Sequence, residues 1–501
     1  MLHAYSADAV RAAEQPLLAA GRGPELMRTA AHGLALGVVS VLRSRGRGAY
    51  GAKVVLLVGS GNNGGDALYA GAFLAARGAR TMALLASVRT HPEALLAFEQ
   101  AGGRCVPLGE SGAPAGFLRE ARQADVVLDG LLGTGGSGGL REPAATVVAQ
   151  LAKLAGPNRP AVVACDLPSG VDATTGEVHG PVLRADLTVT FGAHKTGLLS
   201  APGEQFAGTT ALVDLGLGRH LGPPESFRLE AGDIAALLPQ PAPADHKYTR
   251  GVAGVIAGSA QYPGAALLAV AAASACGPGM VRYLGPEPVT AAIHVRNPEV
   301  VCSHSSPHEV RVQAWLAGPG IDGDQAQLDR AAAAIASRLP TVVDAAALAL
   351  VKPGNSGGNE SLVLTPHAGE LSALLARCGV SLGRARIEAS PLAAARQAAA
   401  LLGAVVLLKG PTTIVAGPDG RVFTQANGTP RLAAAGSGDT LAGMLVALLS
   451  MTAEPLDLAR TAALAAALHG QLAQTDADQP LNAAMLAARI PPVWAELGRQ
   501  H

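Results

Sequence analysis

Two glycine-rich segments, far apart in the chain, carry residue types that hold anions and move protons. The first reads GSGNNGGD from Gly59 to Asp66, and the second reads AAGSGDTLAG from Ala434 to Gly443. Each follows a strand-like stretch and precedes an apolar helical stretch, so backbone N–H groups and the positive end of the helix dipole can face an anion. The sequence therefore predicts two separate active centres.

Polar clusters follow four predicted strands in the first half of the chain. They are GNNGGD (Gly61–Asp66), Asp129 with GTGGSGG (Gly133–Gly139), CDLPSGVD (Cys165–Asp172) and FGAHKTG (Phe191–Gly197). Ligands bind beyond the carboxyl ends of strands in open parallel sheets, so we expect Asp66, Asp129 and Asp166 to converge with Asn63 and Ser169. These oxygen ligands suit a hard cation rather than zinc or iron. The alternative for each loop alone is a tight turn, which the sequence after Asp172 also favours.

The second glycine-rich segment suits phosphoryl transfer. GSGD at a helix start offers backbone donors to a phosphoryl group, and Asp439 is placed to orient a hydroxyl toward it. The helix N-terminus is expected to keep Asp439 ionised. Lys409, at a predicted strand end, is expected to contact a nucleotide. The alternatives are that Asp439 only stabilises its helix, that His367 only serves a turn, and that Lys409 is solvated.

Short apolar runs, typical of strands covered on both faces, alternate with helical stretches and must position these residues. The strands of the first half are predicted at Lys53–Val58, Arg80–Ala86, Asp125–Leu128, Ala161–Ala164, Asp186–Phe191 and Ala211–Val213. Helices are predicted at Ala67–Arg77 and Pro92–Ala101, each followed by a glycine suited to a C-cap. A Gly/Pro-rich break at Gly216–Ser226 is interpreted as a linker.

The alternation resumes in the second half. Strands are predicted at Val252–Ala257, Val281–Leu284, Glu299–Cys302, Ala314–Ala317, Thr341–Asp344, Ser361–Leu364 and Ala404–Leu408. Helices are predicted at Asp324–Arg338, Glu370–Arg377, Leu392–Leu402, Thr440–Met451 and Leu456–Gln471, and a hairpin around GPDG at Gly417–Gly420. The predicted fold class is α/β, with two doubly wound domains.

Composition limits the kinds of partner. The 501 residues suit two or three domains, and the 38 basic and 38 acidic side chains leave no net charge, which disfavours nucleic-acid and membrane binding. Five scattered cysteines without a CxxC pair indicate reduced thiols and a cytoplasmic location. The uncharged stretch Gly251–Val281 is long enough to span a bilayer but is interrupted by proline and glycine, so we interpret it as a buried strand, loop and helix.

The motifs of the first half, with LMRTAAHGLA at Leu26–Ala35, resemble the NAD(P)H-hydrate epimerase family over residues 1–218. The resemblance implies a Rossmann-like domain that interconverts the C6 epimers of hydrated nicotinamide cofactors, with Asp166 as the acid/base at C6. It implies potassium binding by Asn63, Asp129 and Ser169. It also implies contacts with NAD(P)HX from Asn62, Asn63, Gly64, Gly65, Asp66, Gly133, Thr134, Gly135, Gly136, Ser137, Gly138 and Gly139.

The second half resembles the ribokinase-like NAD(P)H-hydrate dehydratase family over residues 228–498. The motifs are HKYTRG (His246–Gly251), GSAQYPGAALLA (Gly258–Ala269), AGPG (Ala317–Gly320), LTPHAGE (Leu364–Glu370), LLKGPTT (Leu407–Thr413) and AAGSGDTLAGM (Ala434–Met444). The resemblance implies dehydration of the S-hydrate driven by ADP or ATP with Mg²⁺, and catalysis by Asp439. It implies substrate contacts from Ala265, Gly320 and His367, and nucleotide contacts from Lys409, Gly410, Pro411, Thr412, Thr413 and Gly438.

The sequence as a whole is therefore interpreted as a fused repair enzyme, with an epimerase domain at 1–222 and a dehydratase domain at 226–501. Its expected partners are NAD(P)HX and an adenine nucleotide, and a homo-oligomer is expected. One rival is a ribokinase-like small-molecule kinase with a non-catalytic, nucleotide-sensing first domain. A kinase would release a stable phosphate ester, whereas the repair enzyme would release a reduced cofactor and free phosphate.

Overall fold

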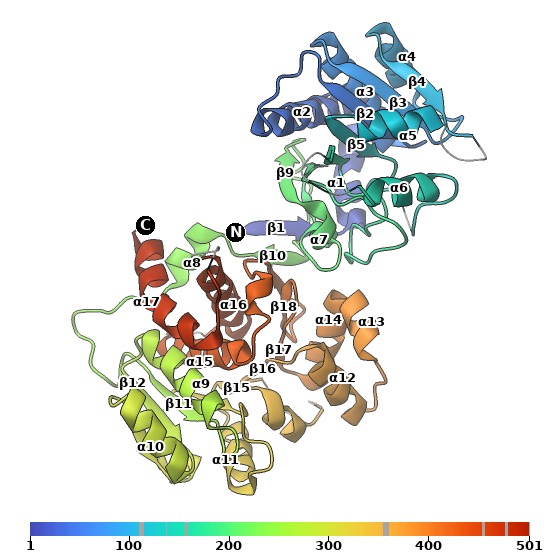
Figure 1. The fold of residues 1–501 in the computed structure, drawn as a ribbon. Coiled ribbons are helices and arrows are strands. Elements are labelled where there is room, and N and C mark those ends of the chain that lie inside the picture. The colour runs from blue at the N-terminus through green and yellow to red at the C-terminus, as the bar shows by residue number, and fades with distance from the viewer. Residues whose placement is uncertain are drawn as a thin grey trace. The chain divides into compact units, whose positions relative to one another are not determined.

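The computed structural model describes residues 1–109, 115–136, 138–154, 156, 159–353, 360–452, 456–475 and 479–499. The chain divides into two compact units, His3–Glu225 and Ser226–His501, and Met1–Leu2 belong to the second. Figure 1 labels their elements. Each unit is an α/β domain with its own sheet and core, as the sequence predicts.

The first unit is built on a parallel sheet in the order β4-β3-β2-β5-β6-β7-β9. Its strands are β2 (Lys53–Val58), β3 (Arg80–Leu85), β4 (Arg104–Pro107), β5 (Val126–Gly130), β6 (Ala161–Cys165), β7 (Leu187–Phe191) and β9 (Thr209–Val213). The short strands β1 (Leu2–Tyr5) and β8 (His194–Lys195) pair in parallel. Strands that follow β2 in the chain are added first on one side of it and then, from β5 onward, on the other side. Ligands are expected at the carboxyl ends of β2 and β5, where this order switches.

Helices cover both faces of this sheet. They are α1 (Ala7–Ala19), α2 (Gly23–Ser44), α3 (Asn62–Ala76), α4 (Pro92–Gln100), α5 (Ala115–Arg122), α6 (Ala144–Ala152) and α7 (Glu204–Ala207), with a 3-10 turn at Thr196–Leu198. Alternate residues of β2 enter different cores: Leu56 packs with Leu34 of α2 and Phe98 of α4, whereas Leu57 packs on the opposite face. This alternation explains the nearly continuous apolar run of β2.

Helix α2 is long and apolar enough to cross a membrane by length and composition alone, and 44% of its apolar window is buried. Its glycines lie directly on the sheet, since a Cβ on Gly33 would be 2.4 Å from Val213 and one on Gly37 would be 2.6 Å from Val189. Helix α2 is therefore a core helix of the first unit.

The second unit has a mixed sheet in the order β13-β12-β11-β14-β15-β16-β17-β18-β19-β10. Its strands are β10 (Ser226–Arg228), β11 (Val252–Ile256), β12 (Met280–Leu284), β13 (Val301–Ser303), β14 (Ala314–Ala317), β15 (Thr341–Val343), β16 (Leu362–Leu364), β17 (Val405–Leu408), β18 (Thr413–Ala416) and β19 (Val422–Gln425). The first seven strands in this order, from β13 to β17, are parallel to one another. Strand β18 is antiparallel to both of its neighbours, β17 and β19. The predicted hairpin at Gly417–Gly420 is confirmed.

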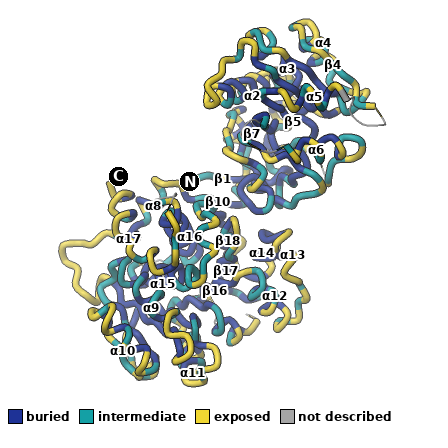
Figure 2. Tube along the Cα trace, in the orientation of Figure 1, coloured by how far each residue is buried: buried dark blue, intermediate teal, exposed yellow. Residues whose placement is uncertain are grey.

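Helices also cover both faces of the second sheet. They are α8 (Ala231–Leu237), α9 (Pro263–Ala275), α10 (Glu287–Arg296), α11 (Gln325–Ala336), α12 (Ala368–Arg377), α13 (Arg384–Ala389), α14 (Pro391–Leu402), α15 (Ser437–Met451), α16 (Leu458–Gln474) and α17 (Ala483–Gly498), with 3-10 turns at Pro307–Glu309, Ala345–Leu350 and Pro430–Leu432. One core packs α9 and α15 against the sheet, and another packs α12 and α14. Figure 2 shows the buried strands and central helices. The uncharged stretch Gly251–Val281 forms β11, a loop and the buried α9, as predicted.

Candidate active sites

Asp166 lies at the centre of the first candidate site. It follows β6 directly and has φ +64°, in the left-handed region that few residues other than glycine, asparagine and aspartate adopt. Its backbone N–H donates to the carbonyl oxygen of Val189 at 2.8 Å. The backbone thus fixes the carboxylate at the carboxyl edge of the sheet.

The carboxylate of Asp166 is surrounded by donors. Its Oδ1 accepts from Lys195 Nζ at 2.5 Å, from Thr190 Oγ1 at 3.1 Å and from the backbone N–H of Phe191 at 3.3 Å. Its Oδ2 accepts from the hydroxyl of Thr134 and from the backbone N–H of Thr134 at 3.2 Å. Burial opposes ionisation, but Lys195 and Thr134 together hold the pKa of Asp166 below its usual value. Asp166 is therefore an ionised carboxylate.

Asp129, Ser169 and Asn63 lie beside this centre. The hydroxyl of Ser169 donates to Asp129 Oδ1 at 2.6 Å, and its backbone N–H donates to Asp129 Oδ2 at 2.9 Å. Asp129 is fully buried, and burial raises its pKa although Ser169 opposes the change. The side-chain amide nitrogen of Asn63 is buried without a partner. The three predicted cation ligands thus lie in the first turn of α3, at the end of β5 and in the loop after β6.

Glycines bring these loops into backbone contact. A Cβ on Gly59 would lie 2.0 Å from the carbonyl oxygen of Leu131, and a Cβ on Gly64 would lie 2.1 Å from that of Gly59. A Cβ on Gly133 would lie 2.7 Å from Oδ1 of Asn63. The first turn of α3, which holds the predicted contacts Asn62 to Asp66, therefore adjoins the loop Gly133–Gly139, of which Ser137 lies outside the described residues.

Asp66 is the third buried carboxyl group of this site, after Asp166 and Asp129. It lies near the start of α3, and its side chain is about as buried as that of Asp166. Its Oδ1 is buried without a hydrogen-bond partner. Burial raises its pKa well above the usual value, and the neighbouring charges of Asp166 and Glu14 raise it further. The surroundings of Asp66 therefore favour its protonated form, whereas those of Asp166 favour the ionised form.

The second candidate site lies where α15 begins at Ser437. Gly436, in the left-handed region at φ +87°, starts the helix, and no side chain caps it. Asp439 lies in the first turn. The expectation that the helix N-terminus keeps Asp439 ionised is wrong: burial first, and then the charge of Asp344, raise its pKa to about 7, although Lys409 opposes the change. Desolvation outweighs the helix dipole here.

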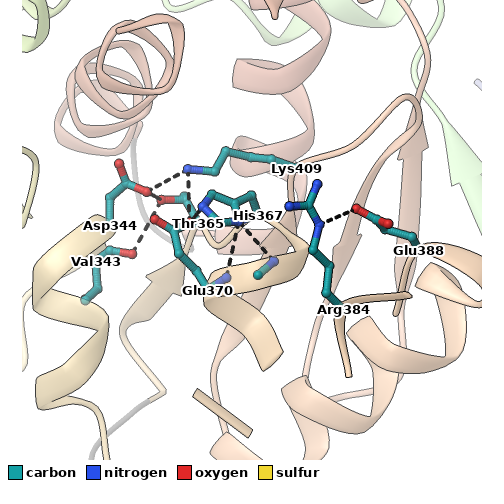
Figure 3. A network of polar contacts seen from close by, with 9 residues as sticks. Val343, Asp344, Thr365, His367, Glu370, Arg384, Glu388 and Lys409 are labelled. Carbon is teal, nitrogen blue, oxygen red and sulfur yellow. Dashed lines mark hydrogen bonds and ion pairs between the residues drawn. The ribbon is translucent and has the colours of Figure 1, made fainter. Parts of the chain in front are cut away.

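The Lys409 side chain lies between Asp344 and the start of α15. Its Nζ donates to Asp344 Oδ1 at 2.9 Å and lies 3.7 Å from Glu370 Oε2. The hydroxyl of Thr365 donates to the same Asp344 oxygen at 2.7 Å, and Figure 3 shows these groups facing one another. Burial disfavours the charged lysine, but Asp344 and Glu370 outweigh it and raise the pKa of Lys409. The alternative of a solvated Lys409 is therefore wrong, because the side chain is mostly buried and ion-paired.

His367 caps helix α12. Its Nδ1 accepts from the backbone N–H groups of Gly369 at 3.0 Å and Glu370 at 3.2 Å, while Glu370 Oε2 accepts from the His367 backbone N–H at 2.8 Å. The ring is exposed, and the arrangement leaves Nε2 as the ring nitrogen that can donate to a ligand. A capping role and a ligand contact are thus compatible in this residue.

The remaining predicted positions lie in α9, in the loops after β14 and β17, at the start of β18 and in α15 itself. A Cβ on Gly320 would lie 2.6 Å from Cβ of Ala265, and a Cβ on Gly438 would lie 3.5 Å from Nζ of Lys409. Gly410 and Pro411 are exposed, whereas Thr412 is buried before β18 begins at Thr413. The AGPG loop touches the charge network directly, because a Cβ on Gly318 would lie 1.8 Å from the carbonyl oxygen of Asp344.

Sequence reasoning missed several side chains of both sites. Lys195 lies within the FGAHKTG cluster, and Asp344 directly follows β15 just as Asp166 follows β6. The position of each residue at the end of a strand is a sequence signal that could have identified it. Thr365 and Glu370 flank His367 in LTPHAGE. Their roles depend on which side chains face them, and spacing along the chain does not specify that.

The fold and the two sites define a two-domain α/β enzyme with a carboxylate centre in each domain. The sequence model of the NAD(P)H-hydrate dehydratase family matches residues 253–492, and that of the YjeF-related protein N-terminus matches residues 23–197. The bifunctional NAD(P)H-hydrate repair enzyme Nnr of Mycobacterium tuberculosis is 44% identical over 454 residues, which cover 90% of this chain and 89% of that protein. The chain belongs to this family of bifunctional NAD(P)H-hydrate repair enzymes.

Two further similarities extend over different parts of the chain. The Mycobacterium leprae bifunctional NAD(P)H-hydrate repair enzyme Nnr is 41% identical over 509 residues, which cover 99% of this chain and 100% of that protein. The crystal structure of ADP/ATP-dependent NAD(P)H-hydrate dehydratase from Bacillus subtilis, co-crystallized with ATP/Mg²⁺, is 29% identical with a TM-score of 0.48. It covers 54% of this chain and 97% of its own.

Replacing Lys195 tests the ion pair in the first site. Lys195→Met leaves Asp166 as a buried, unpaired carboxylate, so we expect the first unit to lose about 3–5 kcal/mol of stability at neutral pH. The deficit narrows as pH falls toward the ordinary range of carboxyl groups, because Asp166 is then protonated. Hydrogen exchange of the β6 and β7 amides measures the loss. Lys153→Met, at an exposed position after α6, is the control, and equal stability of the two variants would contradict the assignment.

Proposed function

We propose that the first unit interconverts R- and S-NAD(P)HX and that the second unit dehydrates S-NAD(P)HX to NAD(P)H at the expense of ADP or ATP. Residues 1–222 are the proposed epimerase domain and 226–501 the proposed dehydratase domain. The observation that supports this division best is that Asp166 and Asp439 lie in separate units, each with its own sheet and a glycine-rich helix start.

In the second unit, Asp439 is the proposed base. Its pKa of about 7 suits a group that accepts the proton of the substrate hydroxyl as the phosphoryl group arrives. Lys409, held by Asp344, is placed beside Gly438 to offset phosphate charge. Ala265, Gly320 and His367 are the proposed substrate contacts, and Lys409 to Thr413 with Gly438 the proposed nucleotide contacts. Mg²⁺ would enter with the nucleotide and neutralise phosphate charge.

In the first unit, Asp166 is the proposed acid/base group at C6 of the hydrate. The first turn of α3 and the loop Gly133–Gly139 are the proposed contacts for the rest of NAD(P)HX. No side chain caps the start of α3, so its first N–H groups can bind a phosphate of the substrate. Thr134 contributes to both roles because its backbone N–H and hydroxyl already orient Asp166.

Potassium fits the cluster of Asn63, Asp129 and Ser169. Asp129 is buried, and no ion pair within the described ranges includes it, so its charge calls for a cation. The Ser169 hydroxyl donates to Asp129 and accepts from the backbone N–H of Leu132 at 2.9 Å, which leaves one lone pair. Asn63 supplies an amide oxygen. A bound potassium ion would compensate Asp129 and hold the loops of the site together.

The cellular setting is also a proposal. All five cysteines are free thiols, which supports a reducing, cytoplasmic location. A homo-oligomer is also proposed, with exposed apolar side chains of the second unit such as Tyr248, Val295 and Val301 as candidate contacts.

Two matched variants test the division of labour. Given mixed NADHX epimers and ADP, Asp439→Asn should form NADH about 10²-fold more slowly or worse and still epimerise. Asp166→Asn should convert only the S epimer present at the start, so absorbance of reduced nicotinamide stops at a plateau that wild type exceeds. Mixing the two variants should restore full conversion. Normal conversion by either variant, or a stable phosphate ester in phosphorus NMR, would refute the proposal.

The pH dependence of dehydration tests the environment of Asp439. Because the ionised form acts as base, kcat/KM should rise with pH through about 7 and then level off. Asp344→Asn removes the charge that raises this pKa, so the rise should move to lower pH. Glu388→Gln, which changes a surface carboxylate paired with Arg384, is the control and should not move it. A rise that stays in place in Asp344→Asn would contradict the assigned coupling.

Alkali ions test the potassium site. Replacing potassium by lithium or by caesium should slow epimerisation more than dehydration, because the proposed ligands all lie in the first unit. Asp129→Asn should remove this preference among cations. Equal sensitivity of the two activities, or insensitivity of both, would argue against the cluster.

A further inference from the structure

Epimerisation at C6 needs a proton donor as well as a base. The hydrate carries its hydroxyl on the carbon next to the ring nitrogen, and the C6–O bond must break and re-form on the other face. A hydroxyl leaves as water only if it gains a proton, and the water that adds back must lose one. One group that stays ionised throughout cannot perform both steps.

Asp166 is poorly suited to donate a proton. Both of its oxygens already accept hydrogen bonds, and one of the donors is the buried ammonium of Lys195 at 2.5 Å. These donors stabilise the ionised carboxylate, so Asp166 holds no proton to give when the reaction starts, and a proton that it accepts is readily passed on. The geometry therefore favours Asp166 as the acceptor.

Asp66 has the opposite surroundings. Its side chain is 8% exposed, its Oδ1 has no hydrogen-bond partner, and no ion pair in the described part of the chain includes it. A carboxyl group buried in this way is stable when it carries a proton. The titratable groups around it are Glu14 of α1, His91 before α4, Cys165 and Asp166 at the end of β6, and Lys195 of β8.

We propose that Asp66 is a second catalytic residue of the first site, a carboxylic acid that donates a proton to the C6 hydroxyl while Asp166 accepts the proton of the water that adds back. This inference rests on the proposed function of the first unit. It gives opposite tasks to two aspartates whose surroundings favour opposite protonation states.

The steps balance without an external oxidant or reductant. Asp66 gives its proton to the hydroxyl, the C6–O bond breaks with its electron pair leaving on water, and the lone pair of the ring nitrogen forms the C6=N1 iminium. Water then adds to the other face of C6 and gives a proton to Asp166. Transfer of that proton through water from Asp166 to Asp66 restores the starting state.

Asp66→Asn tests the inference through pH dependence as well as rate. The epimerisation kcat should fall about 10²-fold or more, with a smaller change in KM. The residual rate should increase about tenfold for each unit by which pH falls, because hydronium then replaces the lost acid. Glu14→Gln, the same change in the neighbouring carboxyl group, should keep the wild-type pH profile. A wild-type rate in Asp66→Asn, or loss of the acid in Glu14→Gln instead, would overturn the inference.

Infrared spectroscopy gives a readout independent of turnover. Wild-type protein at neutral pH, with and without potassium, should show a protonated carboxyl band that is absent from Asp66→Asn and present in Asp166→Asn. Absence of that band from wild type would overturn the inference. If Asp166→Asn stops epimerisation and Asp66→Asn does not, the inference about Asp66 is wrong but the proposed function of the first unit stands. If both variants epimerise normally, the proposed function of the first unit fails as well.

Discussion

Charge burial at the carboxyl edge of a parallel sheet is the constraint on which both sites depend. In each unit an aspartate directly follows a buried strand, where water is excluded, and a lysine from a later strand end compensates it. Lys195 pairs with Asp166 in the first unit, and Lys409 pairs with Asp344 in the second. Both lysines are mostly buried, so each pair is held in low dielectric, where losing one partner costs far more than the pair gains in stability.

In each unit, the carboxylate of the ion pair also helps to raise the pKa of a second aspartate. Asp66 and Asp439 each lie near the start of a glycine-rich helix, close to the compensated carboxylate, and no ion pair among the described residues includes either of them. Burial and the neighbouring negative charge raise the pKa of both. Two domains with different topology thus share one arrangement, an aspartate paired with a buried lysine and a second aspartate nearby whose pKa is raised. The surrounding loops, with their small glycine residues, let the backbone approach closely enough to build it.

The fold was largely predictable because apolar runs and helical stretches alternate clearly along the chain. Strand β4 was missed since Arg104–Pro107 offers only a short apolar run, and β1 and β8 are too short to form a pattern. The sites were partly predictable, because polar residues at parallel strand ends converge in any such sheet. What failed was electrostatic: a local rule about helix ends predicted an ionised Asp439, whereas its protonation depends on burial and on Asp344, which is distant in sequence.

The left-handed backbone at Asp166 limits how this enzyme can vary. At φ +64° the position accepts glycine, asparagine or aspartate with little strain, and most other residues only at a cost in folding. Two of those three residues lack a carboxylate, so they would suit the backbone but leave the ammonium of Lys195 buried without its partner. Aspartate alone satisfies both the backbone and the charge, so this position can change at low cost only together with Lys195.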